Sequence, residues 1–204
     1  MSFQEEAMKR YLVRMALILS LIFPVPVLAE VPLETVKGHV DKVLELLRDP
    51  SLMAESARKV KKDKIRAISE KMFDFTELSK RTLAQNWNKF NPDQQKEFIE
   101  LYKSLLEDAY ANKIMSYTDE KIVFSKEVAL TEKTTEIQST VLRKTAEIPI
   151  YYRVLLKDGV WRVYDVVIEG VSLINNYRAQ FREILSNKPP ESLLETLRKK
   201  VGKA

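Results

Sequence analysis

The sequence contains no cysteine, a single histidine and only four glycines among its 204 residues. Without cysteine, neither a disulfide framework nor a lipid-modified cysteine is available. One histidine, His39, cannot build the usual zinc sites in the absence of cysteine. The few glycines form neither G-x-x-x-x-G-K-[ST] nor G-x-G-x-x-G, so the common phosphate-binding loops are missing. We therefore expect no cofactor and no metal, and we expect His39 at a surface or groove position.

A strong excess of one charge is also lacking, since the net charge is only +5. Nucleic-acid-binding proteins usually carry a denser basic stripe. The densest basic run is RKVKKDKIR, from Arg58 to Arg66, and it contains no interleaved aromatic residue that RNA recognition would use. It is read as a solvated helix face or as a landing site for an acidic partner or an anionic lipid surface. No nucleic-acid partner is expected.

The N-terminal region has the pattern of a secretory signal peptide. A basic lead over residues 8–14 precedes an apolar run from Met15 to Phe23, and small residues stand at −3 and −1 of a cleavage site after Ala29. A membrane anchor is the alternative, but a span needs roughly 20 apolar residues. We predict a signal peptide over residues 1–29, cleaved near Ala29, and a single domain over 30–204. Acidic residues early in the lead leave Met8 as an alternative start to Met1.

The next part of the chain is predicted to be helical. Apolar residues recur at helical spacing from Leu33 to Leu47, and Val60 to Met72 reads as a strongly charged helix. Asp74 is placed as an N-cap that starts a short helix. The clearest start lies at Asn91-Pro92, where a cap is followed by proline at the first helical position. That helix carries an apolar face as far as Tyr110.

After Lys121 the apolar period changes to two, which indicates strands. Four are predicted: Ile122–Leu130, Thr135–Lys144, Ile148–Lys157 and Val160–Glu169. Asp158-Gly159 is a strong two-residue hairpin signal. The register that it sets places Leu156 opposite Trp161, Val154 opposite Val163 and Tyr152 opposite Asp165. In this register Val154, Trp161, Val163 and Val167 share the buried face.

These elements predict an α+β fold, with helices packed on one face of a four-stranded antiparallel sheet, of the cystatin/NTF2-like type. Gly170 is expected to let the last strand turn directly into a helix over Val171–Leu185. Pro189–Val201 is expected to be a polar helix or tail. Asp165 on the inward face needs hydrogen-bond partners, and a structural role is favoured over a catalytic one because no second titratable partner is visible.

Two blocks carry a resemblance to a known family. Phe75 to Ile114 contains the L-x-x-x-W element of Leu83 and Trp87. It also contains the helix start Pro-Asp-Gln-Gln-Lys-Glu-Phe, from Pro92 to Phe98. The second block is VYDVVIEGVSLINNYRAQF, from Val163 to Phe181. Together with the signal peptide, these blocks resemble the MlaC family, also called the toluene-tolerance Ttg2 auxiliary family. The likeness covers nearly all of the mature chain.

The resemblance implies a periplasmic phospholipid carrier that is not an enzyme. Such proteins shuttle lipids between an outer-membrane lipoprotein–porin complex and an inner-membrane ABC transporter complex, and so maintain the lipid asymmetry of the outer membrane. It also implies an apolar lipid cavity between sheet and helices, with the acyl chains inside and the head group outside.

Helix and strand faces then select the residues expected to contact lipid. They are Trp87, Phe98, Leu101, Leu105, Tyr110, Tyr152, Val154, Trp161, Val163, Val167, Ile174 and Tyr177. On this hypothesis Val154→Glu or Val163→Glu abolishes lipid retention. Three alternatives remain open: a carrier of another lipid such as a hopanoid, a lipid-free adaptor with a packed core, and a small-molecule enzyme that uses Asp165.

Overall fold

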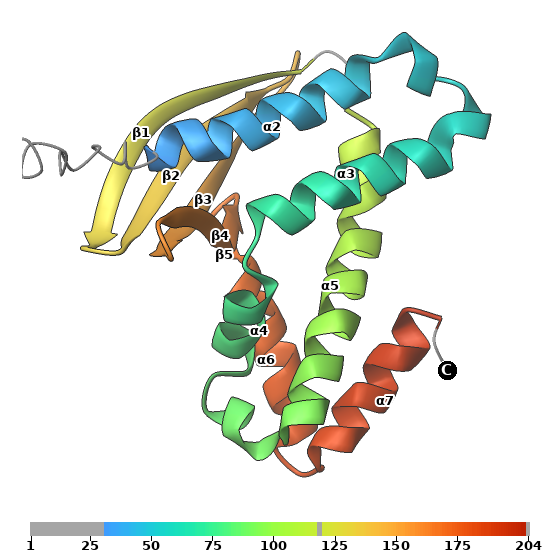
Figure 1. Cartoon of the computed structure of the whole chain (residues 1–204), viewed down its shortest axis with the longest axis vertical. Coiled ribbons are helices and arrows are strands. Elements are labelled where there is room, and N and C mark those ends of the chain that lie inside the picture. Colours follow the sequence, from blue (N-terminus) through green and yellow to red (C-terminus); the bar gives the residue numbers. More distant parts are fainter. Residues whose placement is uncertain (1–30, 118–119, 203–204) are drawn as a thin grey trace, which may run out of the picture.

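The computed structural model describes residues 31–117 and 120–202, so the predicted signal peptide lies outside the described residues. Helices and strands are segregated along the chain, as predicted for an α+β protein (Figure 1). The helices are α2 (Pro32–Arg48), α3 (Arg58–Met72), α4 (Phe75–Leu83), α5 (Pro92–Met115), α6 (Leu173–Leu185) and α7 (Pro190–Lys200), with short 3₁₀ helices η2 (Pro50–Leu52), η3 (Glu55–Ala57) and η4 (Ala84–Lys89). The strands are β1 (Lys121–Thr131), β2 (Thr134–Leu142), β3 (Glu147–Lys157), β4 (Val160–Ile168) and β5 (Val171–Ser172).

The predicted helix starts are confirmed by their caps. Asp74 accepts a hydrogen bond from the backbone N–H of Glu77 at the start of α4. At the start of α5, Asn91 and Gln94 form a reciprocal capping box, with Pro92 in the first turn. These caps satisfy backbone N–H groups that have no partner within the helix.

The sheet has five antiparallel strands in the order β1-β2-β3-β4-β5, so the prediction of four strands was wrong. The fifth strand is only two residues long and pairs Val171 with Ile168. Glu169 and Gly170 both have positive φ, at 50° and 81°, which builds a tight turn before β5. The last strand therefore does not turn directly into a helix. The helix begins at Leu173, after Ser172 has capped it.

A bulge in β4 changes the predicted register. The pairs Leu156–Trp161 and Val154–Val163 are confirmed, but Tyr152 lies opposite Val166 and not opposite Asp165. One extra residue, Tyr164, is inserted in β4, and such an insertion reverses the alternation of the faces beyond it. As a result Val166, and not Val167, shares the face of Val154.

Two hydrophobic clusters fill the molecule. One lies between α2 and the sheet and includes Val36, Ile137, Val154 and Val163. The other fills the bundle of α4, α5, α6 and α7 and also takes in Tyr164 from the opposite face of β4. Figure 1 shows α2 and α3 beside the sheet and the bundle of α4 to α7 beyond its edge. The expectation of helices on one face therefore describes α2 and α3, whereas the bundle also reaches the other face.

The C-terminal segment was expected to be a polar helix or tail, and it is a helix. One side of α7 is apolar and completely buried, through Leu193, Leu194 and Leu197. A bidentate ion pair between Arg198 and Glu97 joins α7 to α5, with Nε–Oε1 and Nη2–Oε2 distances of 2.6 and 2.8 Å. This helix thus completes the core of the bundle.

An apolar cavity between the sheet and helices α2, α3 and α5

A cavity of about 610 Å³ lies between the inner face of the sheet and the helices that cover it. Its lining is mostly apolar. Helix α2 contributes Val40, Val43, Leu44 and Leu47; α3 contributes Ile65, Ile68 and Met72; α5 contributes Leu106, Tyr110 and Ile114; the sheet contributes Val141, Ile150, Tyr152, Val166 and Ile168. Volumes of roughly 300–1,000 Å³ are typical of binding sites for small organic ligands.

Local sequence explains why this space exists. Helix α2 lies along the sheet because Val36 and Val40 pack on the strands, and its residues from Val40 onward also line the cavity. After α2 ends at Asp49, the short helices η2 and η3 lead the chain away from the sheet, and α3 then runs back toward it (Figure 1). Helix α3 buries only Ile65 and Met72.

The twelve residues predicted to contact lipid fall into two groups. Tyr110 and Tyr152 line the cavity. The other ten do not line it. Six lie in the bundle core or pack against it: Trp87, Phe98, Leu101, Leu105, Ile174 and Tyr177. Three lie in the cluster under α2 or pack against it: Val154, Trp161 and Val163. The last, Val167, is buried on the other side of β4. Contact of any of the twelve with lipid stays a prediction.

Most of the cavity lining was not foreseen. The apolar stripe of α2 was recognised from Leu33 to Leu47, but it was not assigned to a cavity. Helix α3 was read through its charges, although Ile65, Ile68 and Met72 recur on one side of it. That i, i+3, i+7 spacing was the available signal, because it marks a helix face turned away from water.

Tyr152 supplies a hydroxyl group on the sheet side of the cavity, beside the apolar residues Ile150 and Val166. Burial raises the pKa of its phenol, and the neighbouring Tyr117 acts in the same direction. The phenol therefore stays protonated at physiological pH and can donate a hydrogen bond. A single polar donor in an apolar pocket can orient a ligand that is otherwise held by its apolar parts.

Charged residues occur in two parts of the wall: on α3 and α5, and at Arg143 and Glu169 just beyond the ends of β2 and β4. Arg66 and Glu107 both line the cavity, and Arg66 Nε donates to Glu107 Oε2 at 2.7 Å. The second oxygen of Glu107 is buried without a hydrogen-bond partner in the described part of the chain. Burial raises the pKa of Glu107, although the adjacent Arg66 opposes that change.

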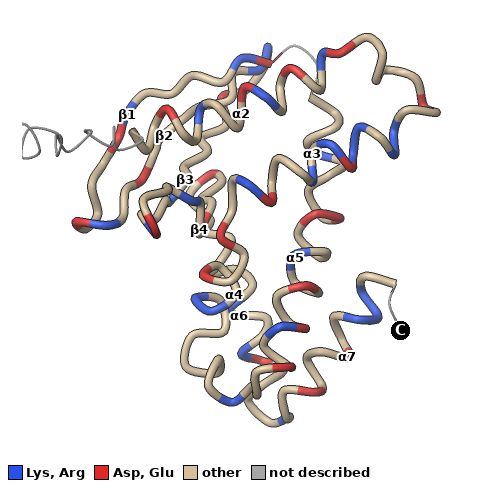
Figure 2. The backbone as a smooth tube through the Cα atoms, viewed as in Figure 1, with Lys and Arg blue, Asp and Glu red and all other residues tan. Residues whose placement is uncertain are grey.

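The basic run Arg58–Arg66 is largely paired within the protein. Lys59 pairs with Asp63 along α3, while Lys62 and Arg66 pair with acidic residues of α5. Figure 2 shows mainly positive charges along α3, with few negative ones among them. Through Lys62 and Arg66 the run also joins α3 to α5.

Asp165 is a structural acceptor in this fold. It is 2% exposed, and its carboxylate accepts hydrogen bonds from Ser172 Oγ, Arg153 Nη1 and the backbone N–H of Ile174. The sequence left the partners of Asp165 open, and the structure supplies these three. Its place outside the cavity lining also separates it from the candidate site.

Neither a metal-binding cluster nor a membrane-spanning helix emerges within residues 31–117 and 120–202. No group of three or more histidine, cysteine, aspartate or glutamate side chains in these ranges is arranged to hold a metal ion. No helix in the same ranges is long and apolar enough to cross a bilayer.

The fold places the chain in the class of α+β proteins with helices packed on an antiparallel sheet. The model of the MlaC protein family matches residues 37–199, and the chain belongs to this family.

Relatives of known name agree with that assignment. The toluene tolerance protein ttg2D of Pseudomonas putida is 24% identical over 172 residues, which are 83% of this chain and 80% of that protein. The intermembrane phospholipid transport system binding protein MlaC of Haemophilus influenzae is 24% identical over 119 residues, 56% of each chain. A phospholipid-binding protein from Ralstonia solanacearum, solved in complex with a phospholipid, has a similar fold. The two structures superpose with a TM-score of 0.75 and share 24% sequence identity. The superposition covers 85% of this chain and 98% of the Ralstonia chain.

Proposed function

We propose that this protein is a periplasmic phospholipid carrier, and that the cavity beneath α2 and α3 is the site that holds the acyl chains. The observation that carries the proposal is the 610 Å³ apolar cavity in a member of the MlaC family. The names of the Haemophilus and Ralstonia relatives support it. We also propose the cystatin/NTF2-like class for the scaffold.

The energetics require a sheltered site of this kind. Two acyl chains of about 16 carbons gain roughly 25 kcal/mol on leaving water, at about 0.8 kcal/mol per methylene. A carrier that left one chain in water would lose about half of that gain. The apolar residues of the sheet, α2, α3 and α5 offer the chains continuous contact, while the polar head group remains outside, so head-group selectivity is expected to be low.

We base the proposed location, partners and role in the cell on membership of the MlaC family. The mature protein would be exported to the periplasm after cleavage near Ala29. It would exchange phospholipid with an inner-membrane ABC transporter complex and an outer-membrane lipoprotein–porin complex, and so maintain outer-membrane lipid asymmetry. In this role the protein carries lipid without catalysing a reaction on it, and energy for direction comes from a partner.

Mass spectrometry of organic extracts tests the proposal. Mature protein purified from its own periplasm is expected to yield diacyl phospholipid in stoichiometric amount. A hopanoid in the extract would favour the alternative cargo on the same scaffold. A clean extract from folded protein that also takes no lipid from vesicles would contradict the carrier and support the adaptor.

A matched pair of variants locates the site. Ile150→Glu places a carboxylate in the cavity wall, where lipid would have to contact it, and is expected to reduce bound lipid at least tenfold. Val123→Glu makes the same change on β1 at a position that is 46% exposed, and is expected to retain wild-type lipid. Full retention by folded Ile150→Glu protein would remove this cavity as the lipid site.

A further inference from the structure

The cavity wall between α3 and α5 shares residues with a second, polar hollow. Arg66 and Glu107 line the apolar cavity on its inner side. The same two residues also line a polar hollow of about 330 Å³, together with the exposed residues Glu100 and Asp108 and the half-buried Lys103. The ion pair of Arg66 and Glu107 therefore stands between the apolar interior and the outer surface.

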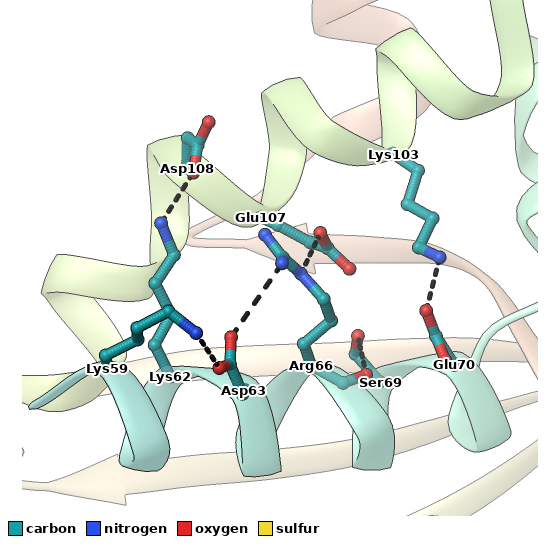
Figure 3. A network of polar contacts seen from close by, with 9 residues as sticks. All are labelled: Lys59, Lys62, Asp63, Arg66, Ser69, Glu70, Lys103, Glu107 and Asp108. Atoms are coloured by element: carbon teal, nitrogen blue, oxygen red, sulfur yellow. Dashed lines mark hydrogen bonds and ion pairs between the residues drawn. The ribbon is translucent and has the colours of Figure 1, made fainter. Parts of the chain in front are cut away.

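Polar contacts join the two helices at this wall. Three ion pairs cross from α3 to α5: Lys62 to Asp108, Arg66 to Glu107 and Glu70 to Lys103 (Figure 3). We call these three pairs the α3–α5 seam. Partly exposed ion pairs contribute little net stability because water solvates the separated charges almost as well. Contacts of this kind close a wall without making its opening costly.

Helix α3 is anchored unequally at its two ends. Its C-terminal end is tied to β4, since the backbone N–H of Asp74 donates to the Val163 carbonyl at 2.9 Å and Arg162 Nη1 donates to the Lys71 carbonyl at 3.0 Å. Its N-terminal end follows an exposed segment, residues 53–57, and is joined to α5 by a 2.8 Å hydrogen bond from Arg58 Nη2 to Asn112 Oδ1. Rotation of α3 about its C-terminal end would open the seam and break this side-chain bond, but would keep the contacts with β4.

The closed seam is imperfectly satisfied at Glu107. One carboxylate oxygen receives the 2.7 Å hydrogen bond from Arg66, and the other is buried with no hydrogen-bond partner in the described residues. A buried acceptor without a partner is unfavourable, because it has lost water and gained nothing in exchange. Opening the seam would separate Glu107 from Arg66 and expose both carboxylate oxygens to water.

We propose that the α3–α5 seam is the passage through which acyl chains enter and leave the cavity, and that its ion pairs are the latch. This inference rests on the proposed function as a lipid carrier and adds the route of exchange. The apolar residues Ile65 and Ile68 of α3 lie directly behind the latch in the cavity wall. They would contact the chains as these pass and would close over them afterwards.

Cross-linking the seam tests the route. The chain has no native cysteine, so Lys62→Cys with Asp108→Cys provides two unique thiols in place of an ion pair whose Nζ and Oδ1 are 2.7 Å apart. A short dithiol-reactive linker that forms disulfides closes the seam reversibly. The measurement is transfer of a fluorescent phospholipid from vesicles of phosphatidylethanolamine and phosphatidylglycerol. We expect transfer at least tenfold slower in the linked protein, and recovery after reduction.

The control uses the same chemistry without crossing the seam. Lys59 and Asp63 form an ion pair of 2.9 Å one turn apart on α3, so Lys59→Cys with Asp63→Cys links α3 only to itself. Its transfer rate is expected to be unchanged by the linker. Equal rates for the linked and reduced Lys62→Cys/Asp108→Cys proteins would overturn the proposed passage. Wild-type protein that takes up no lipid would instead overturn the carrier function itself, and with it this inference.

Discussion

Ser172 Oγ donates a 2.7 Å hydrogen bond to Asp165 Oδ2, and this bond joins the start of α6 to the middle of β4. The same hydroxyl accepts from the backbone N–H of Asn175 and so caps the helix. Asp165 Oδ1 accepts from the backbone N–H of Ile174, the second residue of α6. A single buried carboxylate thus sets the angle at which the helix leaves the sheet.

Asp165→Ala is expected to destabilise the protein by about 2–4 kcal/mol, because it leaves Ser172, Arg153 and a helix N-terminal N–H without their acceptor. Denaturant unfolding measures the change. Asp165→Asn keeps one acceptor oxygen and is expected to lose less. Lipid carried per folded molecule should remain at the wild-type level in both variants; loss of carriage without loss of stability would indicate that Asp165 acts in the function.

Val154→Glu is expected to unfold the protein instead of emptying a pocket. Val154 is fully buried under α2, away from the cavity lining, and a carboxylate there would have no partner. We expect a loss of more than about 4 kcal/mol in the free energy of unfolding. Circular dichroism with urea titration checks this. A folded Val154→Glu protein that has lost its lipid would restore the original hypothesis that this strand position contacts acyl chains.

Glu107 gives the stability of the protein a specific pH dependence. Burial raises the pKa of this carboxyl above its ordinary value of 4.5, against the opposing effect of Arg66 and Lys103 and with a small contribution from Glu70. The folded state then binds a proton more tightly than the unfolded state. The resulting stabilisation is present below pH 4.5 and is lost as the pH rises through the raised pKa.

Comparison with Glu107→Gln isolates that effect. The variant cannot ionise at this position, so the stability difference between wild type and variant should shift in favour of the wild type as the pH falls through this window. Urea unfolding at a series of pH values measures it. A shift of the opposite sign would mean that the ion pair with Arg66 outweighs burial. Asp93→Asn, which removes an exposed carboxyl of the same helix, serves as the control.

Removal of bound lipid should lower thermal stability. A ligand that binds only the folded state stabilises it by about 2.7 kcal/mol at a concentration of 100 times Kd. For a chain of this size that corresponds to a fall in Tm of about 5–10 °C on delipidation. Calorimetry of native, delipidated and reloaded protein checks the value. Ile150→Glu protein should show little response to reloading, and an unchanged Tm in delipidated wild type would contradict a lipid-filled cavity.

The local features of this protein are encoded in short stretches of its sequence. Asp74 and Asn91 start their helices because their side chains accept from backbone N–H groups three residues further on, and Asp158-Gly159 turns the hairpin because both residues adopt positive φ. The family could also be recognised at this level, since the block around Asp165 and Ser172 is contiguous. Such features depend on neighbours in the chain, so the sequence alone determined them.

The cavity depended on the tertiary structure. The bulge at Tyr164 exchanged Val167 for Val166 on the inner face, and nothing in the local pattern announces one extra residue in a strand. An apolar side of a helix looks the same in sequence whether it packs on a core, as Phe98 does, or lines an open space, as Ile68 does. Only the distance between α3 and the sheet distinguishes these cases, and that distance is set by contacts between residues far apart in the chain.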